Sequence, residues 1–184
     1  MSFHTLNPME LNENVFSLIQ SDWFLMAAEK EGRVNAMTVS WASLGILWTK
    51  PVVMAAVRPE RYTREFLDAA GSFSMTIFSK KYRKMLAYFG TVSGRQEDKV
   101  AKQQLTVLHK DNIPYFEEAR LALLCTTLCR TLLCESDFLT DKAFIDKWYG
   151  GENKPNGEGG GYHYLYIAEI KDVLENDSQK DIQS

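Results

Sequence analysis

Cysteine is scarce in this 184-residue sequence, which contains only Cys125, Cys129 and Cys134. An odd number of cysteines argues against a disulfide framework. No Cys-x-x-Cys pair is present, although paired spacing is usual in zinc sites. We therefore expect no metal site. We predict buried thiols in a strand. In an unbroken strand Cys125 and Cys129 share one face and Cys134 points to the other.

Long apolar runs are also absent. The most apolar stretch, residues 119–134, is interrupted by Arg120 and Arg130, and a membrane-spanning helix needs about 20 apolar residues. The first eight residues lack the charged and apolar regions of a secretory signal. We therefore expect a cytoplasmic protein that does not bind a membrane.

The sequence has no excess of positive charge, since its formal net charge is −3. This argues against nucleic acid as a partner. The charge is uneven, however: nine Lys and Arg residues and five acidic residues lie between Arg58 and Lys99. Such a basic zone suits a local anion site such as a phosphate site. It is equally compatible with the solvated faces of two helices.

Segments that are predicted to form β-strands dominate the sequence. Period-two alternation and β-branched or aromatic content predict strands over residues 23–28, 34–47, 52–57, 73–78, 121–134 and 162–170. Short helices are predicted from Pro59–Glu60 to Gly71, over 82–89, from Glu97, and over 141–148. A Gly-rich loop is expected over 150–161.

This pattern predicts a mainly β fold with short helices. The sequence has no Gly-x-Gly-x-x-Gly turn between a strand and a helix, which disfavours a dinucleotide-binding doubly wound sheet. The remaining candidate is an antiparallel β-barrel with helical decoration. We expect one domain over residues 1–174 and a polar C-terminal tail over 175–184.

The strand segment from Asn35 to Trp41 is the first candidate site. A flavin ring needs small polar partners along one edge and apolar surface against its faces, and this segment offers both. Its candidate cofactor-binding residues are Asn35, Met37, Thr38, Val39, Ser40 and Trp41. A half-exposed strand without a ligand is the alternative.

Two basic turns that join a strand to a helix are the second candidate. Helix N-termini expose free N–H groups and bind phosphate, and cationic side chains add charge-assisted bonds. The candidate residues are Arg58, Arg61, Tyr62 and Thr63 in the first turn and Phe78, Ser79, Lys80 and Lys81 in the second. Capped helices with exposed cations are the alternative.

His163 precedes the last strand in the segment Gly161-Tyr-His-Tyr164. Histidine can carry a proton near neutral pH, so His163 is the candidate catalytic residue. A structural histidine at a strand start is the alternative.

The order of these features resembles the flavin reductase-like, FMN-binding split-barrel proteins, in particular the flavoredoxin branch. The resemblance covers residues 22–173. It rests on residues 35–41, Pro51 and the strand after it, residues 58–63, 71–81, 89–95 with Asp98 and Lys99, and His163. The segment Ser93-Gly94-Arg95 with Asp98-Lys99 resembles a family signature, and a structural turn with a helix cap explains it equally well.

The resemblance implies an FMN-binding split β-barrel that forms a homodimer, with FMN near the interface. Residues 35–41 would line the flavin ring and ribityl chain, residues 58–63 and 79–81 would hold the phosphate, and His163 would lie near the ring. The implied activity passes electrons from NAD(P)H through FMN to free flavin or a redox partner protein.

Two alternatives stay open. One is a flavoredoxin-like electron-transfer flavoprotein, and the other is a flavin-binding protein without turnover. The sequence also departs from the reductase pattern at one position, because Tyr162 precedes His163 where many reductases carry an aspartate.

Overall fold

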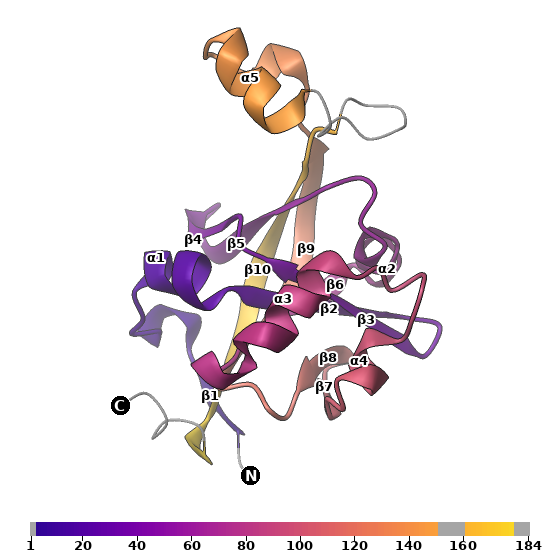
Figure 1. Cartoon of the computed structure of the whole chain (residues 1–184). Coiled ribbons are helices and arrows are strands. Elements are labelled where there is room, and N and C mark those ends of the chain that lie inside the picture. The colour runs from indigo at the N-terminus through magenta and orange to yellow at the C-terminus, as the bar shows by residue number, and fades with distance from the viewer. Residues whose placement is uncertain (1–2, 151–160, 179–184) are drawn as a thin grey trace.

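One antiparallel sheet organises the computed structural model, which describes residues 3–150 and 161–178 (Figure 1). The strand order is β3-β2-β6-β9-β10-β5-β4, and β1 also pairs with β10. The strands are β1 (Phe3–Leu6), β2 (Phe24–Lys30), β3 (Arg33–Val39), β4 (Ala42–Leu47), β5 (Lys50–Val57), β6 (Ser72–Ile77), β9 (Leu121–Leu132) and β10 (Tyr164–Asn176). A separate hairpin joins β7 (Val107–Lys110) to β8 (Ile113–Phe116). The predicted mainly β fold is confirmed.

Short helices connect the strands, as predicted. They are α1 (Val15–Ser17), followed by a π-helical turn at Leu18–Asp22, α2 (Thr63–Ala70), α3 (Arg83–Thr91), α4 (Lys99–Lys102) and α5 (Lys142–Tyr149). Asp98 and Asp141 cap α4 and α5 through their side chains, and Gly71 ends α2 with a left-handed φ of 65°, which glycine adopts without strain. Helix α2 begins at Thr63 rather than at Pro59–Glu60, because those two residues form a turn before it.

The predicted strand over residues 34–47 is two strands, and this break positions the site. β3 and β4 occupy opposite ends of the strand order, so Ser40 and Trp41 carry the chain from one edge of the sheet to the other. The pattern could not show this break because both halves have the same strand character. The polar residues of this segment are therefore placed at a sheet edge.

The last strand extends further than expected. β10 runs to Asn176 and pairs with β1 there, two residues beyond the predicted end of the domain. Asn176 is buried, and its Nδ2 donates to the carbonyl oxygens of Glu117 and Ala119 at 3.1 Å. Residues 175 and 176 thus belong to the fold, whereas 179–184 lie outside the described residues.

Three apolar clusters pack against the sheet, and the two larger ones lie on opposite faces of it. The largest contains Phe24, Phe66, Phe73 and Tyr166. The second lies under α3 and contains Leu25, Phe78, Leu86, Phe89 and Phe116. Together they hold α2 and α3 against the sheet. No helix among residues 3–150 and 161–178 is long and apolar enough to cross a bilayer.

The placement predicted for the cysteines is wrong, because β9 contains a β-bulge. Cys129 lies opposite Ile167 while Thr127 lies opposite Ala168, so Leu128 is an extra residue between them. A bulge of one residue reverses the face of everything beyond it. Cys125 is therefore buried, Cys129 lies on the opposite face, and Cys134 lies beyond the strand and is exposed. The described residues contain no group of metal ligands.

We expect the three thiols to differ sharply in reactivity. Burial raises the pKa of the Cys125 thiol, and a buried neutral thiol reacts slowly. Titration of the native protein with 5,5′-dithiobis(2-nitrobenzoate) should show a fast phase from Cys134 and no reaction of Cys125 until the chain is unfolded. Loss of the fast phase in Cys134→Ser would confirm its origin. Fast native labelling of Cys125 would contradict the packing described for β9.

Candidate functional site

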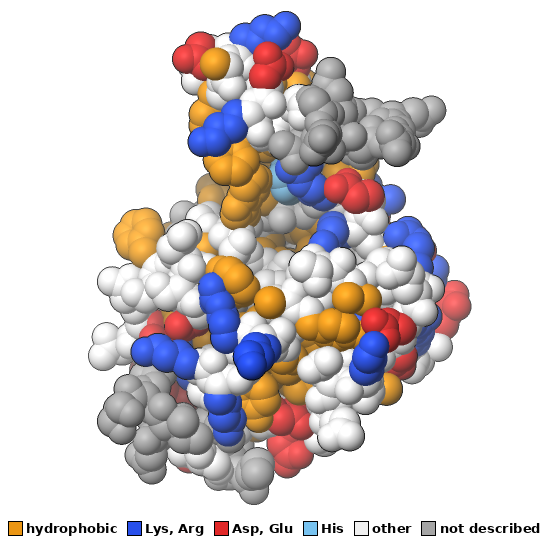
Figure 2. Space-filling view, viewed as in Figure 1, with side chains coloured by type: hydrophobic (Ala, Val, Ile, Leu, Met, Phe, Trp, Pro, Cys, Tyr) orange, Lys and Arg blue, Asp and Glu red, His pale blue; other side chains and the backbone are white. Residues whose placement is uncertain are grey.

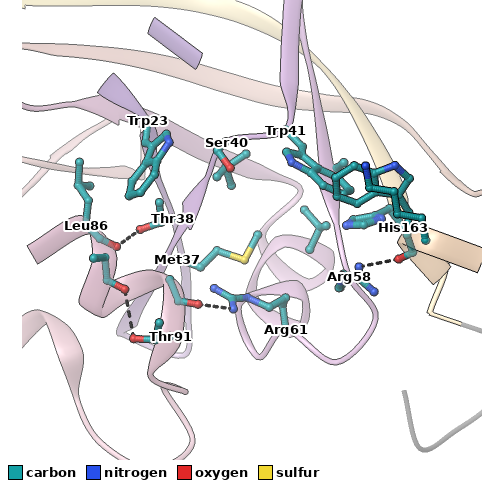
Figure 3. Close-up of a pocket in the computed structure, with 17 residues that line it drawn as sticks. Trp23, Met37, Thr38, Ser40, Trp41, Arg58, Arg61, Leu86, Thr91 and His163 are labelled. Atoms are coloured by element: carbon teal, nitrogen blue, oxygen red, sulfur yellow. Dashed lines mark hydrogen bonds between the residues drawn. The ribbon is translucent and has the colours of Figure 1, made fainter. Parts of the chain in front are cut away.

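A cavity of about 550 Å³ lies where the chain crosses from β3 to β4 (Figure 3). Cavities of this size are typical of small-molecule sites. In the space-filling view, the molecule is hollowed between the projecting part that carries α5 and the rest of the chain (Figure 2). We call this 550 Å³ space the larger cavity. Its lining residues are Trp23, Met37, Thr38, Val39, Ser40, Trp41, Ala56, Val57, Arg58, Arg61, Leu86, Ala87, Gly90, Thr91, Lys147, Trp148 and His163.

The strand β3 forms one wall of this cavity. Five of the candidate cofactor-binding residues line it, namely Met37, Thr38, Val39, Ser40 and Trp41. The Thr38 hydroxyl donates to the Leu86 carbonyl of α3, which fixes the distance between the strand and the helix. The wall therefore offers backbone groups, a hydroxyl and an indole to a ligand.

Asn35 has a different position from the one predicted. It is buried and lines neither cavity of the site. Its Nδ2 donates to Thr63 Oγ1 at 2.8 Å. Asn35 thus ties β3 to the start of α2 instead of facing the space where a ligand could bind.

A smaller cavity, about 180 Å³, adjoins the larger one and shares Met37, Arg61 and Thr91 with it. Its other lining residues are Glu60, Tyr62, Thr63, Val92, Ser93, Gly94 and Lys99. Tyr62 and Thr63, both predicted to hold an anion, therefore lie here and not in the larger cavity. The first basic turn is thus placed at the junction of the two cavities.

Arg61 and Lys99 are two neighbouring cations in this smaller cavity. Arg61 Nη1 donates to the Gly90 carbonyl at 2.7 Å, and Lys99 Nζ donates to the Phe89 carbonyl at 3.2 Å. These carbonyls lie near the C-terminal end of α3, where the helix dipole favours cations. Burial, with the adjacent Arg61 charge, lowers the pKa of Lys99 to about 8.

Lys99 is buried and Arg61 is half-buried. Such a pair of like charges suits an anion, because an anion would satisfy both cations at once. Two carboxylates lie nearby. Glu60 lines the smaller cavity, and Glu97 is bound to Lys102 on the exposed side of α4. The two basic groups are therefore not matched by a buried acidic partner among the described residues.

The second basic turn, residues 78–81, lies outside both cavities. Phe78 packs in the second apolar cluster, and Ser79 is buried with no hydrogen-bond partner for its hydroxyl in the described structure. Lys80 and Lys81 are exposed. None of these four residues lines either cavity, so the structure joins the first turn to Lys99 instead. The signal for Lys99 was its place after Asp98 in the segment that resembles a family signature.

Arg58 lines the larger cavity and stabilises its wall through hydrogen bonds to backbone carbonyls. Its guanidinium donates to the carbonyl oxygens of Trp148 at 3.1 Å and Gly161 at 3.3 Å. These bonds tie the end of α5 and the start of β10 to the strand β5. Arg58 does not line the smaller cavity, so it lies apart from the Arg61–Lys99 pair.

His163, the candidate catalytic residue, lines the larger cavity. Its Nδ1 lies 3.2 Å from the Tyr149 hydroxyl. Burial, and secondarily the Arg58 charge, lowers the pKa of His163 to about 4. The imidazole is therefore neutral at pH 7 and can exchange a hydrogen bond without carrying charge.

Trp23 and α5 also contribute to the cavity, and neither contribution was predicted from the sequence. Lys147 and Trp148 reach the cavity from α5, which lies at the far end of β9 and β10 (Figure 1). The apolar spacing of Phe144, Ile145 and Trp148 predicts a helix but does not show what its apolar face contacts. No signal in the sequence distinguished a cavity tryptophan from a core one.

The protein-family comparison decides what this chain is related to. The model described as "Flavin reductase like domain" matches residues 16–182, which is most of the chain. The chain belongs to the flavin reductase-like family. The resemblance identified from the sequence is therefore confirmed.

Solved structures share the fold of this flavin reductase-like chain. A flavoredoxin from Methanosarcina acetivorans has a TM-score of 0.63 at 24% identity, over 91% of this chain and 75% of that one. An FMN-binding domain of a flavin reductases-like enzyme from Shewanella baltica has a TM-score of 0.65 at 15% identity, over 95% and 77%. The fold is thus the split β-barrel of these proteins, as predicted.

A curated relative matches only in part. An uncharacterized protein from Aeropyrum pernix is 31% identical over 71 residues, which is 39% of this chain and 27% of that protein. The flavin reductase-like chain therefore spans about a quarter of this relative's length.

Proposed function

We propose that this chain is an FMN-dependent oxidoreductase of the flavin reductase type. It would pass electrons from NAD(P)H through FMN to free flavin or to a redox partner protein in the cytoplasm. The observation that carries the proposal is the Arg61–Lys99 pair, which lies in a small cavity continuous with a larger, aromatic-lined one. This arrangement matches a molecule with an anionic end and a planar ring.

The residues of the smaller cavity fit the phosphate of FMN. Arg61 and Lys99 would supply charge, and the Thr63 hydroxyl and the backbone around Gly94 line the same space. A single terminal phosphate suits this cavity better than the larger diphosphate of FAD. The second basic turn, Ser79 to Lys81, lies outside this arrangement, and we assign it no contact with the phosphate.

The residues of the larger cavity would hold the flavin ring. Thr38, Val39 and Ser40 would follow one edge of it, and Trp41 and His163 would lie at the end of the wall. FMN supplies hydride acceptance and electron release when it is bound. The role of the chain is to orient the ring, exclude water and offer hydrogen bonds from β3 and His163.

The proposal includes a homodimer. Exposed apolar side chains lie on β5, on β9 and in the segment after β9, namely Met54, Leu128, Leu132 and Leu139. Exposed apolar surface of this kind is typical of an interface. Light scattering should return a mass close to that of two chains, and a mass close to that of one chain would contradict the dimer.

Steady-state assays separate this proposal from its alternatives. Oxidation of NADH or NADPH that depends on added FMN supports the reductase function. A chain that binds FMN but oxidises neither nicotinamide is an electron-transfer flavoprotein or a flavin-binding protein. Reduction of its flavin by a partner protein then distinguishes those two.

The affinity for FMN should depend on pH through Lys99. With a pKa of about 8 in the free protein, Lys99 is charged below that pH and loses its charge above it. The preference for FMN over riboflavin should therefore be constant from about pH 6.5 to 7.5, since the second phosphate pKa is about 6. It should then fall as the pH rises above 8, by up to about tenfold per unit.

Lys99→Arg provides the matched control for this pH dependence, because arginine keeps its charge. Titration of both proteins with FMN and riboflavin from pH 6.5 to 9.5 measures the effect. A wild-type preference that stays flat through this range would contradict the role of Lys99.

A further inference from the structure

Four cations lie together on the surface where α3 begins, and we call them the basic face. They are Lys80, Lys81, Arg83 and Lys84, of which the three lysines are exposed and Arg83 is half-buried. Figure 2 shows Lys and Arg side chains gathered on the side of the molecule that carries α3. None of the four residues lines either cavity, so the proposed flavin site leaves the basic face without a role.

The charge of the basic face is not matched within the fold. In the part of the chain that the structure describes, none of its four cations forms an ion pair with a carboxylate. Glu13 and Asp22 both bind Arg120 instead, and Glu118, whose charge acts on Tyr82, accepts from the Thr106 backbone at 2.8 Å. Other cations of the chain have carboxylate partners, among them Arg64, Arg95, Lys102 and Arg130.

The stability of α3 does not explain these cations. The N-terminus of a helix carries partial positive charge, where acidic side chains are favourable and cations are not. Arg83 and Lys84 occupy the first two positions of α3, which has no acid in its first turn, and Lys80 and Lys81 lie just before it. Like charges in this place oppose the helix dipole and repel each other. They therefore fit a role in binding better than a role in folding.

The basic face borders the cavity that we propose for the flavin ring. The Arg83 guanidinium lies over the indole of Trp23 and donates to the Ser21 carbonyl. Trp23 lines the larger cavity, and so does Ala87, which lies one helical turn after Arg83 and Lys84. A protein seated on the basic face would therefore lie beside the flavin ring, where electrons have a short path between the two redox groups.

We propose that the basic face docks the acidic surface of a one-electron carrier protein. The inference rests on the proposed function, which leaves open whether free flavin or a partner protein takes the electrons. Unpaired cations match carboxylates around the carrier's redox group, whereas the formal net charge of −3 disfavours an acidic partner elsewhere on the chain. The overall reaction oxidises one NAD(P)H, reduces two carrier molecules by one electron each and releases one proton.

Two forms of one haem protein test the sign of the docking charge. Native cytochrome c is basic, and succinylated cytochrome c carries carboxylates in place of lysine charges. The FMN-loaded full chain is reduced anaerobically with dithionite, so that the test does not depend on NAD(P)H. The second-order rate of haem reduction is then measured by absorption.

The rate with succinylated cytochrome c should fall about tenfold or more between about 0.01 M and about 1 M salt, because the Debye length shortens from about 30 Å to about 3 Å. The rate with native cytochrome c should not fall, because the basic face repels it.

Lys84→Glu and Lys142→Glu form a matched pair of variants. Each reverses an exposed charge in the first turn of a helix, in α3 and in α5 respectively. Each should therefore keep or slightly raise the free energy of unfolding. Lys84→Glu should slow the reduction of succinylated cytochrome c about threefold to tenfold at low salt and not at about 1 M salt. Lys142→Glu should change this rate, and both variants the FMN affinity, by less than about twofold.

Four results would overturn the inference. The first two are a rate with succinylated cytochrome c that rises with salt and an equal slowing in the two variants. The third is a slowing in Lys84→Glu that persists at high salt, which would indicate damage to the flavin site. The fourth is binding of duplex DNA that Lys84→Glu weakens while the rate with succinylated cytochrome c is unchanged, which would assign the basic face to nucleic acid.

The proposed function and the docking face can fail separately. If the chain takes up no FMN, the proposed function fails. Quenching of the tryptophan fluorescence of the free chain by the haem of succinylated cytochrome c then still measures docking. Wild type should bind this probe more tightly than Lys84→Glu at low salt, and equal binding would contradict the basic face as a docking surface.

Discussion

Arg61→Ala should weaken FMN binding about tenfold to hundredfold while riboflavin binding changes by less than about twofold. A charge-assisted contact to a partly buried phosphate contributes roughly 1.5–3 kcal/mol, and riboflavin has no phosphate. Lys99→Met should have the same selective effect, because Lys99 lies in the same small cavity as Arg61. Calorimetric titration of each variant with both ligands measures the difference.

Lys81→Ala is the control for this pair of variants. Lys81 belongs to the same basic zone of the sequence but is exposed and lines neither cavity. Its removal should change FMN affinity by less than about twofold, as is usual for a surface charge. Equal losses of FMN and riboflavin in Arg61→Ala would show only a loosened fold, since Arg61 also bonds the Gly90 carbonyl. A selective loss in Lys81→Ala would place the phosphate at the second turn.

Gly94→Ala should destabilise the protein by about 1–3 kcal/mol, which is the cost of disturbing a buried polar group. A Cβ at this position would overlap the Asn35 side-chain oxygen and lie 3.1 Å from a Tyr62 ring carbon. Asn35 is buried and bonded to Thr63, so it cannot move without breaking that bond. FMN affinity should fall as well, because Gly94, Tyr62 and Thr63 line the smaller cavity. Denaturant unfolding and FMN titration measure the two effects.

Gly45→Ala is the matched control for Gly94→Ala. A Cβ on Gly45 would meet no atom within 4 Å, so the free energy of unfolding should change little or rise slightly. Asn35→Ala in the Gly94→Ala background should recover part of the lost stability, because it removes the overlapping atoms. A Gly94→Ala variant as stable as wild type would contradict the close packing of Asn35 against Gly94.

The strands and helices were predictable where local pattern decides them. The alternation in 73–78 and the Gly71 stop of α2 depend on neighbours in sequence, so the sequence carries that information. The strands β7 and β8, of four residues each, are too short for a pattern. The bulge at Leu128 depends on pairing with β10, which a single strand does not reveal.

The sequence indicated which kinds of residue form the site, but not which individual residues come together there. The basic zone of residues 58–99 indicated an anion site, and Arg61 lies in it. Which of its nine cations converge depends on how α3 and α4 pack against β3, and this brought Lys99 to Arg61 rather than Lys81. In the same way, Trp148 reaches the cavity only because β9 and β10 carry α5 to the β3–β4 crossing.

The absorption spectrum of the FMN-loaded protein during anaerobic addition of NADH, and then of NADPH, tests the central claim most directly. The account predicts that the flavin band of the bound cofactor is present at the start and is bleached by at least one of the two nicotinamides. A bound flavin that stays oxidised with both would contradict the assignment of this chain as an oxidoreductase of the flavin reductase type.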